Sequence, residues 1–177
     1  MANLPIGAPV IPFDLPGVDG EQHCLDEFAD KQALAVVFTC NHCPYAQGWE
    51  DRLIQLQRDY ADRGVAFIAI SANDPVKYPG DNFEAMRERA RTHTYPYPYL
   101  QDLPQTTARA YGAERTPEVF LFDSARRLAY HGAPDDNADM DKVQQHYLRD
   151  AIEAVLAGRP VPIAETPPVG CTIKWTN

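Results

Sequence analysis

Two continuous apolar runs separated by an amphipathic segment constrain the fold of this chain more than any other feature. Residues 33–39 read ALAVVFT and residues 65–71 read VAFIAIS. Such runs are typical of strands that are buried on both faces of a sheet. Between them apolar side chains recur at helical spacing, and Gly64 follows where a helix would end. The pattern predicts a strand, a helix and a parallel strand, which is the unit of an α/β sheet.

Further segments extend this unit in both directions. The stretch VIPFDL, a turn with two glycines and EQHCL predict an irregular N-terminal hairpin. Asp81 is predicted to cap a helix over residues 83–93, and periodic apolar side chains predict another helix over residues 141–156. The runs EVFLF and RLAYHG predict a β-hairpin, and we expect a short extended piece at 96–102 and a short helix at 105–111.

The order of these elements predicts one α/β domain over residues 1–157. Its central mixed sheet would hold two parallel strands and an antiparallel pair, with helices on both faces. The proline-rich segment 158–177 is expected to be an extended C-terminal tail that packs on the domain. A chain of 177 residues is long enough to bury a core of its own.

The charge of the chain excludes several classes of partner. It has 16 basic and 25 acidic residues, a formal net charge of −9. A nucleic-acid backbone would be repelled, and no cluster of Lys and Arg offers a local exception. No apolar run approaches the roughly 20 residues of a membrane span, and the first residues lack the pattern of a signal peptide. We therefore expect a cytoplasmic protein without a nucleic-acid or membrane partner.

The motif TCNHCP at residues 39–44 carries the strongest chemical signal. Cys40 and Cys43 stand between a predicted buried strand and a predicted helix. The free N–H groups and the positive dipole end of a helix stabilise a thiolate, which is the nucleophilic form of cysteine. This placement predicts a lowered pKa for Cys40 and a more buried, less ionised Cys43. Cys40 would then attack a disulfide, and Cys43 would resolve the mixed disulfide.

Other interpretations of this motif stay open. Four cysteines are too few for a disulfide scaffold, and in a reducing compartment a close pair is typical of redox or metal chemistry. A zinc site would need two further ligands, and the remaining Cys and His residues are scattered, so we expect no metal. His42 either stabilises the Cys40 thiolate or is a solvated residue at the helix start.

The dipeptide Thr116-Pro117 directly precedes the EVFLF run. Proline removes a donor from a sheet ladder, so it fits at an edge or at the first residue of a strand. A cis bond at this position would turn the Thr116 backbone toward its neighbour, and an ordinary trans bond is the alternative.

Together, the buried strand, the CxxC pair at a helix start and the later Thr-Pro resemble the thioredoxin superfamily over nearly the whole chain. The stretch PFDLPGVDG and the long segment 73–99 are similar to the branch that holds peroxiredoxins (alkyl hydroperoxide reductase/thiol-specific antioxidant) and TlpA/ResA-type reductases. The sequences FTCNHCPYAQGWEDRL and GCTIKW are similar to a bacterial group of thioredoxin-like, redoxin-domain proteins. The resemblance implies a thioredoxin-like fold.

The resemblance also implies a role for each matching residue. Cys40 would be the nucleophile and Cys43 the resolving thiol. Pro117 would be a cis-proline that faces them, and the Thr116 backbone would pair with a substrate peptide as an added strand. His42 has the position of the histidine in the CGHC and CPHC motifs of disulfide isomerases and oxidases, which favours a more oxidising couple than CGPC.

The chain departs from the family pattern at several positions. Leu34 stands where thioredoxins carry a buried acid, so Cys43 needs another base or water for deprotonation. Relatives often have a cysteine where this chain has Arg115. If Arg115 points at the motif, its charge would lower the Cys40 pKa further, and a solvated arginine is the alternative. The peroxiredoxin pattern Pro-x-x-x-Thr/Ser-x-x-Cys is absent, which disfavours a peroxidase of the usual kind.

Residues outside these motifs carry weaker signals. Cys171 is either a third redox thiol or a free buried thiol that packs under Trp175. Asp74, Asp135 and Asp136 are interpreted as solvated loop acids or helix caps.

These observations predict a thiol-disulfide oxidoreductase that needs no cofactor. Its partners would be protein or small-molecule disulfides and thiols, with a thioredoxin or glutathione system as a source of electrons. The alternatives are a thiol-dependent peroxidase with antioxidant activity and a non-catalytic metal-binding or scaffold protein on the same fold.

Overall fold

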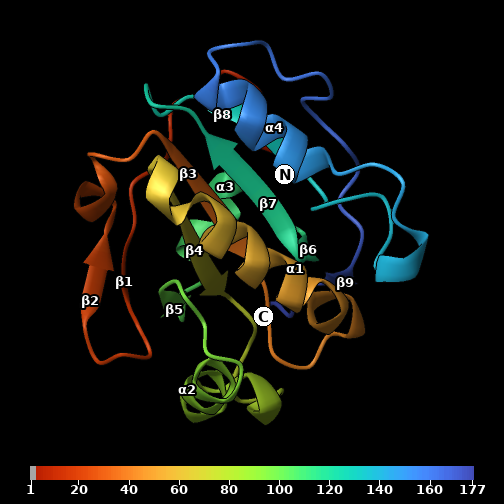
Figure 1. The fold of residues 1–177 in the computed structure, drawn as a ribbon. Coiled ribbons are helices and arrows are strands. Elements are labelled where there is room, and N and C mark those ends of the chain that lie inside the picture. Colours follow the sequence, from red (N-terminus) through yellow and green to blue (C-terminus); the bar gives the residue numbers. More distant parts are fainter. Residues whose placement is uncertain (1–2) are drawn as a thin grey trace.

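The computed structural model describes residues 3–177 and contains a central five-stranded sheet (Figure 1). Its strands are β3 (Ala33–Phe38), β4 (Val65–Ser71), β5 (Tyr99–Gln101), β7 (Glu118–Phe122) and β8 (Leu128–Gly132). They lie in the order β5-β4-β3-β7-β8. The first three are mutually parallel, whereas β7 runs antiparallel to both β3 and β8. The mixed α/β sheet predicted from the sequence is confirmed, and β5, expected only as an extended piece, adds a third parallel strand.

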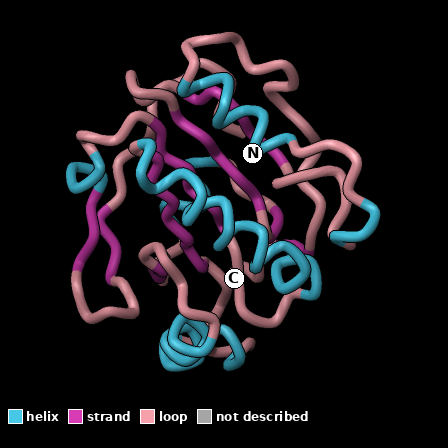
Figure 2. The backbone as a smooth tube through the Cα atoms, viewed as in Figure 1, coloured by secondary structure: helices cyan, strands magenta, loops and turns pink. Residues whose placement is uncertain are grey.

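Helices cover both faces of this sheet. The α-helices within residues 3–177 are α1 (Pro44–Tyr60), α2 (Phe83–Thr92), α3 (Thr106–Tyr111) and α4 (Tyr147–Leu156). Short 3-10 helices are η1 (Leu25–Phe28), η2 (Ala61–Arg63), η3 (Pro79–Asp81) and η4 (Met140–Lys142). The helices α1 and α4 lie on one face and α3 on the other (Figures 1 and 2). Across residues 3–177 we find no helix with the length and apolarity that a membrane crossing demands.

The strand β3 is enclosed between these layers. Every residue of β3 is at most 3% exposed. Val37 packs with Trp49 of α1 on one face, whereas Val36 and Phe38 pack with Tyr111 of α3 on the other. Because successive side chains of a strand point to opposite faces, only a continuous apolar run can fill both cores. The prediction of a doubly buried strand is confirmed.

The helix α1 follows the sequence pattern closely. Its buried side chains include Trp49, Leu53 and Tyr60, which recur at helical spacing. Each large apolar side chain that becomes buried contributes about 1.5–3 kcal/mol to folding. The chain leaves the helical region through η2 and turns at Gly64, whose φ of 79° lies in the left-handed region that favours glycine.

Two small ladders complete the fold. At the N-terminus, β1 (Asp14–Pro16) pairs antiparallel with β2 (Gln22–Cys24), which is the predicted hairpin. Near the C-terminus, β9 (Cys171–Thr172) pairs antiparallel with β6 (Arg115–Thr116). In Figure 1 the strands β6 and β9 lie beside the first turn of α1. The extended C-terminal tail is therefore held next to the CxxC motif.

The predicted helix over residues 141–156 is wrong in its first half. Only α4 is α-helical, and η4 is a separate short turn. The Asp136 carboxylate accepts the Gln144 N–H group at 2.9 Å, and the Leu148 N–H group donates to the Pro134 carbonyl at 3.0 Å. These bonds tie the segment to the preceding loop and leave no continuous helical ladder.

The predicted cap of α2 is displaced by one residue. The N-cap is Asn82, whose side-chain oxygen accepts the Ala85 N–H group at 2.8 Å. Asp81 is instead buried, with 1% of its surface exposed. Its carboxylate points away from the helix and toward the CxxC motif, where it accepts the Asn41 N–H group at 2.7 Å.

Candidate active site

The two cysteines of the TCNHCP motif lie in the connection from β3 to α1. Cys43 is the N-cap of α1, and Pro44 is its first residue. Proline suits this position because the missing N–H group would have no partner in the first turn. Cys40 and Cys43 expose 3% and 1% of their surfaces. Both are free thiols, and they form one buried cluster with Ala46.

Thr116 and Pro117 approach the cysteines from the other side. The peptide bond between them is cis, as the resemblance implies. The Cys40 sulfur lies 3.5 Å from the Thr116 hydroxyl oxygen, and the Cys43 sulfur lies 3.4 Å from the Thr116 carbonyl oxygen. The structure therefore brings the CxxC motif and the Thr-Pro dipeptide, which are far apart in the sequence, into direct contact.

The two thiols have opposite acidities. The pKa of Cys40 is raised above that of a free thiol by its hydrogen bond with Cys43 and by burial, and the charge of Asp81 adds to this. The pKa of Cys43 is lowered to about 4, mainly by the hydrogen bond from Cys40. The Cys171 thiol and the Ala46 N–H group also donate to Cys43, whereas burial acts against them. The two thiols therefore share one proton at neutral pH, and their two titration steps belong to the pair.

The lowered pKa is that of Cys43, whereas the sequence predicted it for Cys40 and expected a less ionised Cys43. The prediction rested on a helix that starts around Cys43, with Cys40 at its N-terminus. Because α1 begins only at Pro44, the free N–H groups of its first turn lie at Cys43 instead. Cys40 precedes the helix and lies on the side of the Asp81 carboxylate, which disfavours a second negative charge.

Asp81 is a site residue that sequence reasoning missed. One carboxylate oxygen accepts the Asn41 N–H group at 2.7 Å, and the other accepts the Asn73 side-chain amide at 2.8 Å. The second oxygen also forms an ion pair with Nδ1 of His42. The His42 side chain is 41% exposed, and its ring stacks on the ring of Tyr78. His42 is thus anchored at the site by a buried acid, and it is not a freely solvated residue.

His42 and Asp81 bring an acid–base group to the Cys40 sulfur. A His42 ring nitrogen, an Asp81 carboxylate oxygen and the Cys40 sulfur all lie within 4.8 Å of one another. A nucleophile next to a base that a third group orients is the arrangement found in activated cysteines. Asp81 could not be distinguished from a helix cap in the sequence, because an acid before Asn82 fits that role equally well.

Arg115 extends along the C-terminal tail. Its guanidinium donates to the Gly170 carbonyl at 3.4 Å. Burial and the hydrogen bond with Cys43 raise the pKa of Cys171, and the Arg115 charge partly offsets this increase. The further lowering of the Cys40 pKa that we considered for Arg115 is not found, since that pKa is raised.

Cys171 lies against the dithiol. It is half-buried, packs on the cluster of Cys40 and Cys43, and is hydrogen bonded to Cys43. Trp175 has a different partner, since its ring lies under the guanidinium of Arg109 at 4.4 Å. Cys171 is a half-buried free thiol that packs on the dithiol, whereas Trp175 packs against the core cluster on the α3 face of the sheet.

Glu118 is a second buried acid near the site. One of its carboxylate oxygens accepts the N–H groups of Glu114 and Arg115, both at 2.9 Å. The other lies 2.6 Å from Nε2 of His131. Glu118 fixes the backbone just before Thr116 and so positions the surface that faces the thiols. The only sequence signal for it was a single acid in the apolar EVFLF run.

The sequence model of the AhpC/TSA family matches residues 6–131. This segment is most of the chain and contains both the CxxC motif and Thr116-Pro117. The chain belongs to the AhpC/TSA family. The resemblance to the thioredoxin superfamily and its redoxin branch is confirmed. No curated protein matches the sequence.

Solved structures share the fold of this AhpC/TSA protein. A hypothetical protein from Sinorhizobium meliloti is 38% identical with a TM-score of 0.93, over 99% of this chain and 97% of that one. An uncharacterized conserved protein from Geobacillus kaustophilus is 38% identical with a TM-score of 0.92, over 97% and 93%. A thioredoxin-family thiol:disulfide interchange protein from Chlorobium tepidum is 19% identical with a TM-score of 0.66, over 88% and 99%. The predicted thioredoxin-like fold is confirmed.

The AhpC/TSA site also contains residues that could bind a metal ion. Cys40, His42 and Asp81 offer one ligand atom each within 4.8 Å. Zinc in structural sites takes four protein ligands, and this group offers three. The Asp81 oxygens already accept two N–H groups, from Asn41 and Asn73. The geometry fits a hydrogen-bonded acid–base group better than a metal centre.

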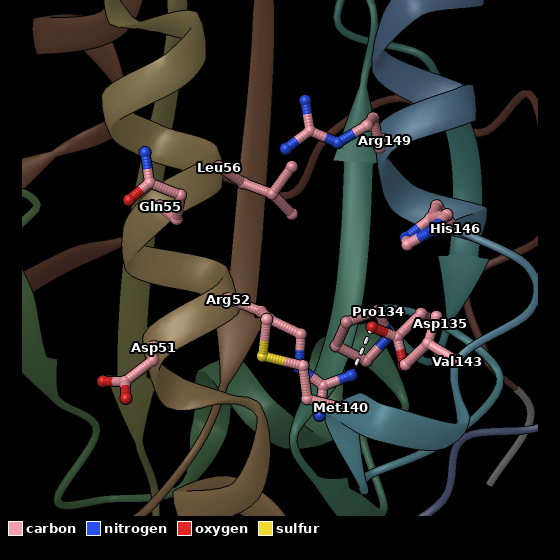
Figure 3. Close-up of a pocket in the computed structure, with 10 residues that line it drawn as sticks. All are labelled: Asp51, Arg52, Gln55, Leu56, Pro134, Asp135, Met140, Val143, His146 and Arg149. Carbon is pink, nitrogen blue, oxygen red and sulfur yellow. Dashed lines mark hydrogen bonds and ion pairs between the residues drawn. The ribbon is translucent and has the colours of Figure 1, made fainter.

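A separate cavity of roughly 430 Å³ lies between α1 and the segment 134–149 (Figure 3). Asp135 projects into it and is bound by Arg52 at 2.5 Å and by the Trp49 indole N–H group at 2.7 Å. Asp135 is 5% exposed, so its interpretation as a solvated acid is wrong. None of the residues that line this cavity is a cysteine. This cavity is therefore separate from the buried CxxC site.

Proposed function

We propose that this chain is a thiol-disulfide oxidoreductase whose redox centre is the Cys40/Cys43 dithiol. The observation that carries the proposal is the buried contact of both thiols with Thr116, which precedes the cis-Pro117. The opposite pKa shifts of the two thiols support it. A pair that keeps one thiolate at neutral pH is prepared for thiol-disulfide exchange.

The first step is attack by Cys40 on a substrate disulfide. The Cys40 proton passes along the hydrogen bond to the Cys43 thiolate. Thr116 supports the result of this transfer, since its hydroxyl can donate to a Cys40 thiolate and its carbonyl accepts the Cys43 proton. The Cys40 thiolate then forms a bond to one substrate sulfur, and the other sulfur leaves as a thiolate.

The second step is resolution by Cys43. The leaving substrate thiolate takes the Cys43 proton, and the Cys43 thiolate attacks the mixed disulfide at Cys40. A Cys40–Cys43 disulfide forms, and the second substrate sulfur leaves as a thiol after it takes a proton from solvent. Two electrons have moved from the dithiol to the substrate. Leu34 replaces the usual buried acid, so the leaving substrate thiolate serves as the base for Cys43.

His42 and Asp81 offer a second route for the Cys40 proton. The His42 ring is close to the Cys40 sulfur and is oriented by its ion pair with Asp81. Because the ring is partly exposed, it can exchange a proton with solvent.

The proposed partners are disulfides and thiols, either on proteins or on small molecules. A thioredoxin or glutathione system would reduce the dithiol again. The proposal includes a cytoplasmic location, which rests on the use of a close cysteine pair without a disulfide scaffold.

The test is reduction of insulin or a model disulfide by the purified protein. Cys40→Ser should abolish turnover, and Cys43→Ser should stop after one step with the substrate covalently attached at Cys40. Cys24→Ser is the matched control, because Cys24 lies in the β1–β2 hairpin. Full activity in Cys40→Ser would exclude the proposal.

A thiol-dependent peroxidase is the second candidate. The AhpC/TSA match favours it, since this family name refers to hydroperoxide reductase and antioxidant proteins. The peroxiredoxin pattern around the first cysteine is nevertheless absent. Peroxide consumption with a thiol donor, faster than reduction of any disulfide, would support this candidate over the first.

A further inference from the structure

The C-terminal tail occupies the edge where a substrate peptide would pair. The register of β6 and β9 sets Thr116 opposite Cys171 and Arg115 opposite Thr172. The ladder continues at Ile173, whose N–H group donates to the Glu114 carbonyl at 2.9 Å. The resemblance implied that the Thr116 backbone would pair with a substrate, and in this structure the chain itself supplies that strand.

The close approach of the tail to Thr116 requires a glycine at position 170. A Cβ atom at Gly170 would lie 2.0 Å from the Thr116 carbonyl oxygen, so any larger residue would force the two strands apart. Beyond the ladder, Ile173 is 3% exposed in the core and Lys174 donates its N–H group to Asn73 at 2.9 Å. The tail is therefore fixed on both sides of Cys171.

The ladder places a third sulfur at the dithiol. Cys171 packs on the cluster of Cys40 and Cys43, and its thiol and its backbone both help to lower the pKa of Cys43. Cys43 thus lies next to two thiols, those of Cys40 and Cys171. Cys171 is half-buried, whereas Cys40 and Cys43 are at most 3% exposed. Of the three sulfurs, Cys171 is the one that solvent reaches most easily.

From this arrangement we infer that Cys171 is the third thiol of a relay, which takes the disulfide from Cys40–Cys43 to Cys43–Cys171. The inference rests on the proposed dithiol function. The sequence predicted only a third redox thiol. In the relay, Cys171 reacts with Cys43, and the tail strand β9 takes the place of a substrate peptide beside Thr116.

The exchange needs no further oxidant. The Cys171 thiolate attacks the Cys43 sulfur of the Cys40–Cys43 disulfide, a Cys43–Cys171 bond forms, and the Cys40–Cys43 bond breaks. Cys40 leaves as a thiolate and takes the proton that Cys171 lost. Cys171 is oxidised and Cys40 is reduced, so the number of disulfides is unchanged. An external dithiol or glutathione then reduces the Cys43–Cys171 bond with two electrons, at the more exposed sulfur.

The test maps disulfides in the full-length protein. Wild type and variants are equilibrated in dithiothreitol redox buffers, quenched with acid, alkylated and mapped by mass spectrometry. Wild type should contain both Cys40–Cys43 and Cys43–Cys171 bonds, and Cys40→Ser should form the Cys43–Cys171 bond alone. Cys24→Ser should give the wild-type pattern.

Gly170→Ala tests the tail while it keeps every thiol. The added methyl group should move the tail away from Thr116. The ratio of Cys43–Cys171 to Cys40–Cys43 disulfide should then fall at least about tenfold, which corresponds to about 30 mV for a two-electron couple. Thr172→Ala, on the same strand with an exposed side chain, should leave the ratio unchanged.

The failure of this inference can be told apart from the failure of the proposed function. If Cys43 and Cys171 stay free thiols in Cys40→Ser, in buffers that fully oxidise the wild-type pair, the relay is wrong. The dithiol function then still stands if the wild type turns over a disulfide. A wild type that reduces no disulfide overturns both.

Discussion

Cys40 and Cys43 are separated by two residues, yet they face different parts of the molecule. Cys40 lies before the helix, beside the Thr116 hydroxyl and on the side of the buried Asp81 carboxylate. Cys43 caps α1 and receives hydrogen bonds from the Ala46 N–H group and from the tail. Cys40 therefore lies near a negative charge, whereas Cys43 lies near hydrogen-bond donors. The comparison shows that two cysteines only three positions apart can have different electrostatic surroundings, because one precedes the helix and the other caps it.

The largest expected effect concerns the titration of these thiols. Reduced wild type should show one thiolate that titrates near pH 4. In Cys40→Ala the midpoint should rise, because Cys43 loses its strongest hydrogen-bond donor. Ultraviolet thiolate absorbance measures both, with Cys24→Ala as the control. A first thiolate that appears only near the free-thiol value of about 8.5 would contradict this account.

The same pKa sets the sign of a pH effect on stability. The folded pKa of Cys43 lies at about 4, below the unfolded value of about 8.5. Between these values the unfolded state binds more protons, so the contribution of Cys43 to the free energy of unfolding rises with pH. It is lost as the pH falls through the folded pKa. Urea unfolding of reduced wild type and Cys43→Ser should therefore show a difference that grows with pH.

Asp81→Asn should have the next largest effect. Asp81 accepts two N–H groups and pairs with His42 in a buried setting. Loss of its charge should cost about 2 kcal/mol of the free energy of unfolding. It should also make Cys40 more acidic, because a nearby negative charge is removed. Chemical denaturation and Cys40 alkylation rates measure the two effects.

The control for Asp81→Asn is Glu84→Gln. The Glu84 side chain is 75% exposed, and its ion pair with Arg87 lies on the surface. The control should change stability by less than about 0.5 kcal/mol. An unchanged alkylation rate at Cys40 in Asp81→Asn would show that the negative charge of Asp81 does not affect the pKa of Cys40.

The smallest expected effect is that of Arg115→Ala. The variant loses one long hydrogen bond, 3.4 Å from Arg115 to the Gly170 carbonyl. We expect a loss of about 0.5 kcal/mol in the free energy of unfolding. The pKa of Cys171 should rise slightly, because a positive charge next to it is removed, while the midpoint of Cys43 stays in place. Thermal unfolding and alkylation of Cys171 measure these changes, and Arg91→Ala on the exposed face of α2 is the control.

The elements of the sheet could be predicted because their signals are local. The runs that became β3, β4 and β7 are largely apolar, which is typical of strands that are buried on both faces. The start of α1 was also encoded locally. Pro44 at the first helical position indicates that the cap is the residue before it, which would have placed the helix dipole at Cys43.

The surroundings of the thiols could not be predicted in the same way. Asp81 is separated from Cys40 by 41 positions of chain, and Cys171 from Cys43 by a still longer stretch. Their contacts depend on where the η3 loop and the tail pack, which no local pattern determines. The sequence could show that Cys171 was present, whereas only the β6–β9 register shows that it lies opposite Thr116.

The most direct test of the central claim is a single-turnover experiment on the reduced wild-type protein. It is mixed with one equivalent of a small disulfide, quenched with acid and mapped by mass spectrometry. The account predicts that both substrate thiols are released and that the new disulfide includes Cys43. A substrate disulfide that stays intact, or a substrate half that remains attached at Cys24, would contradict it.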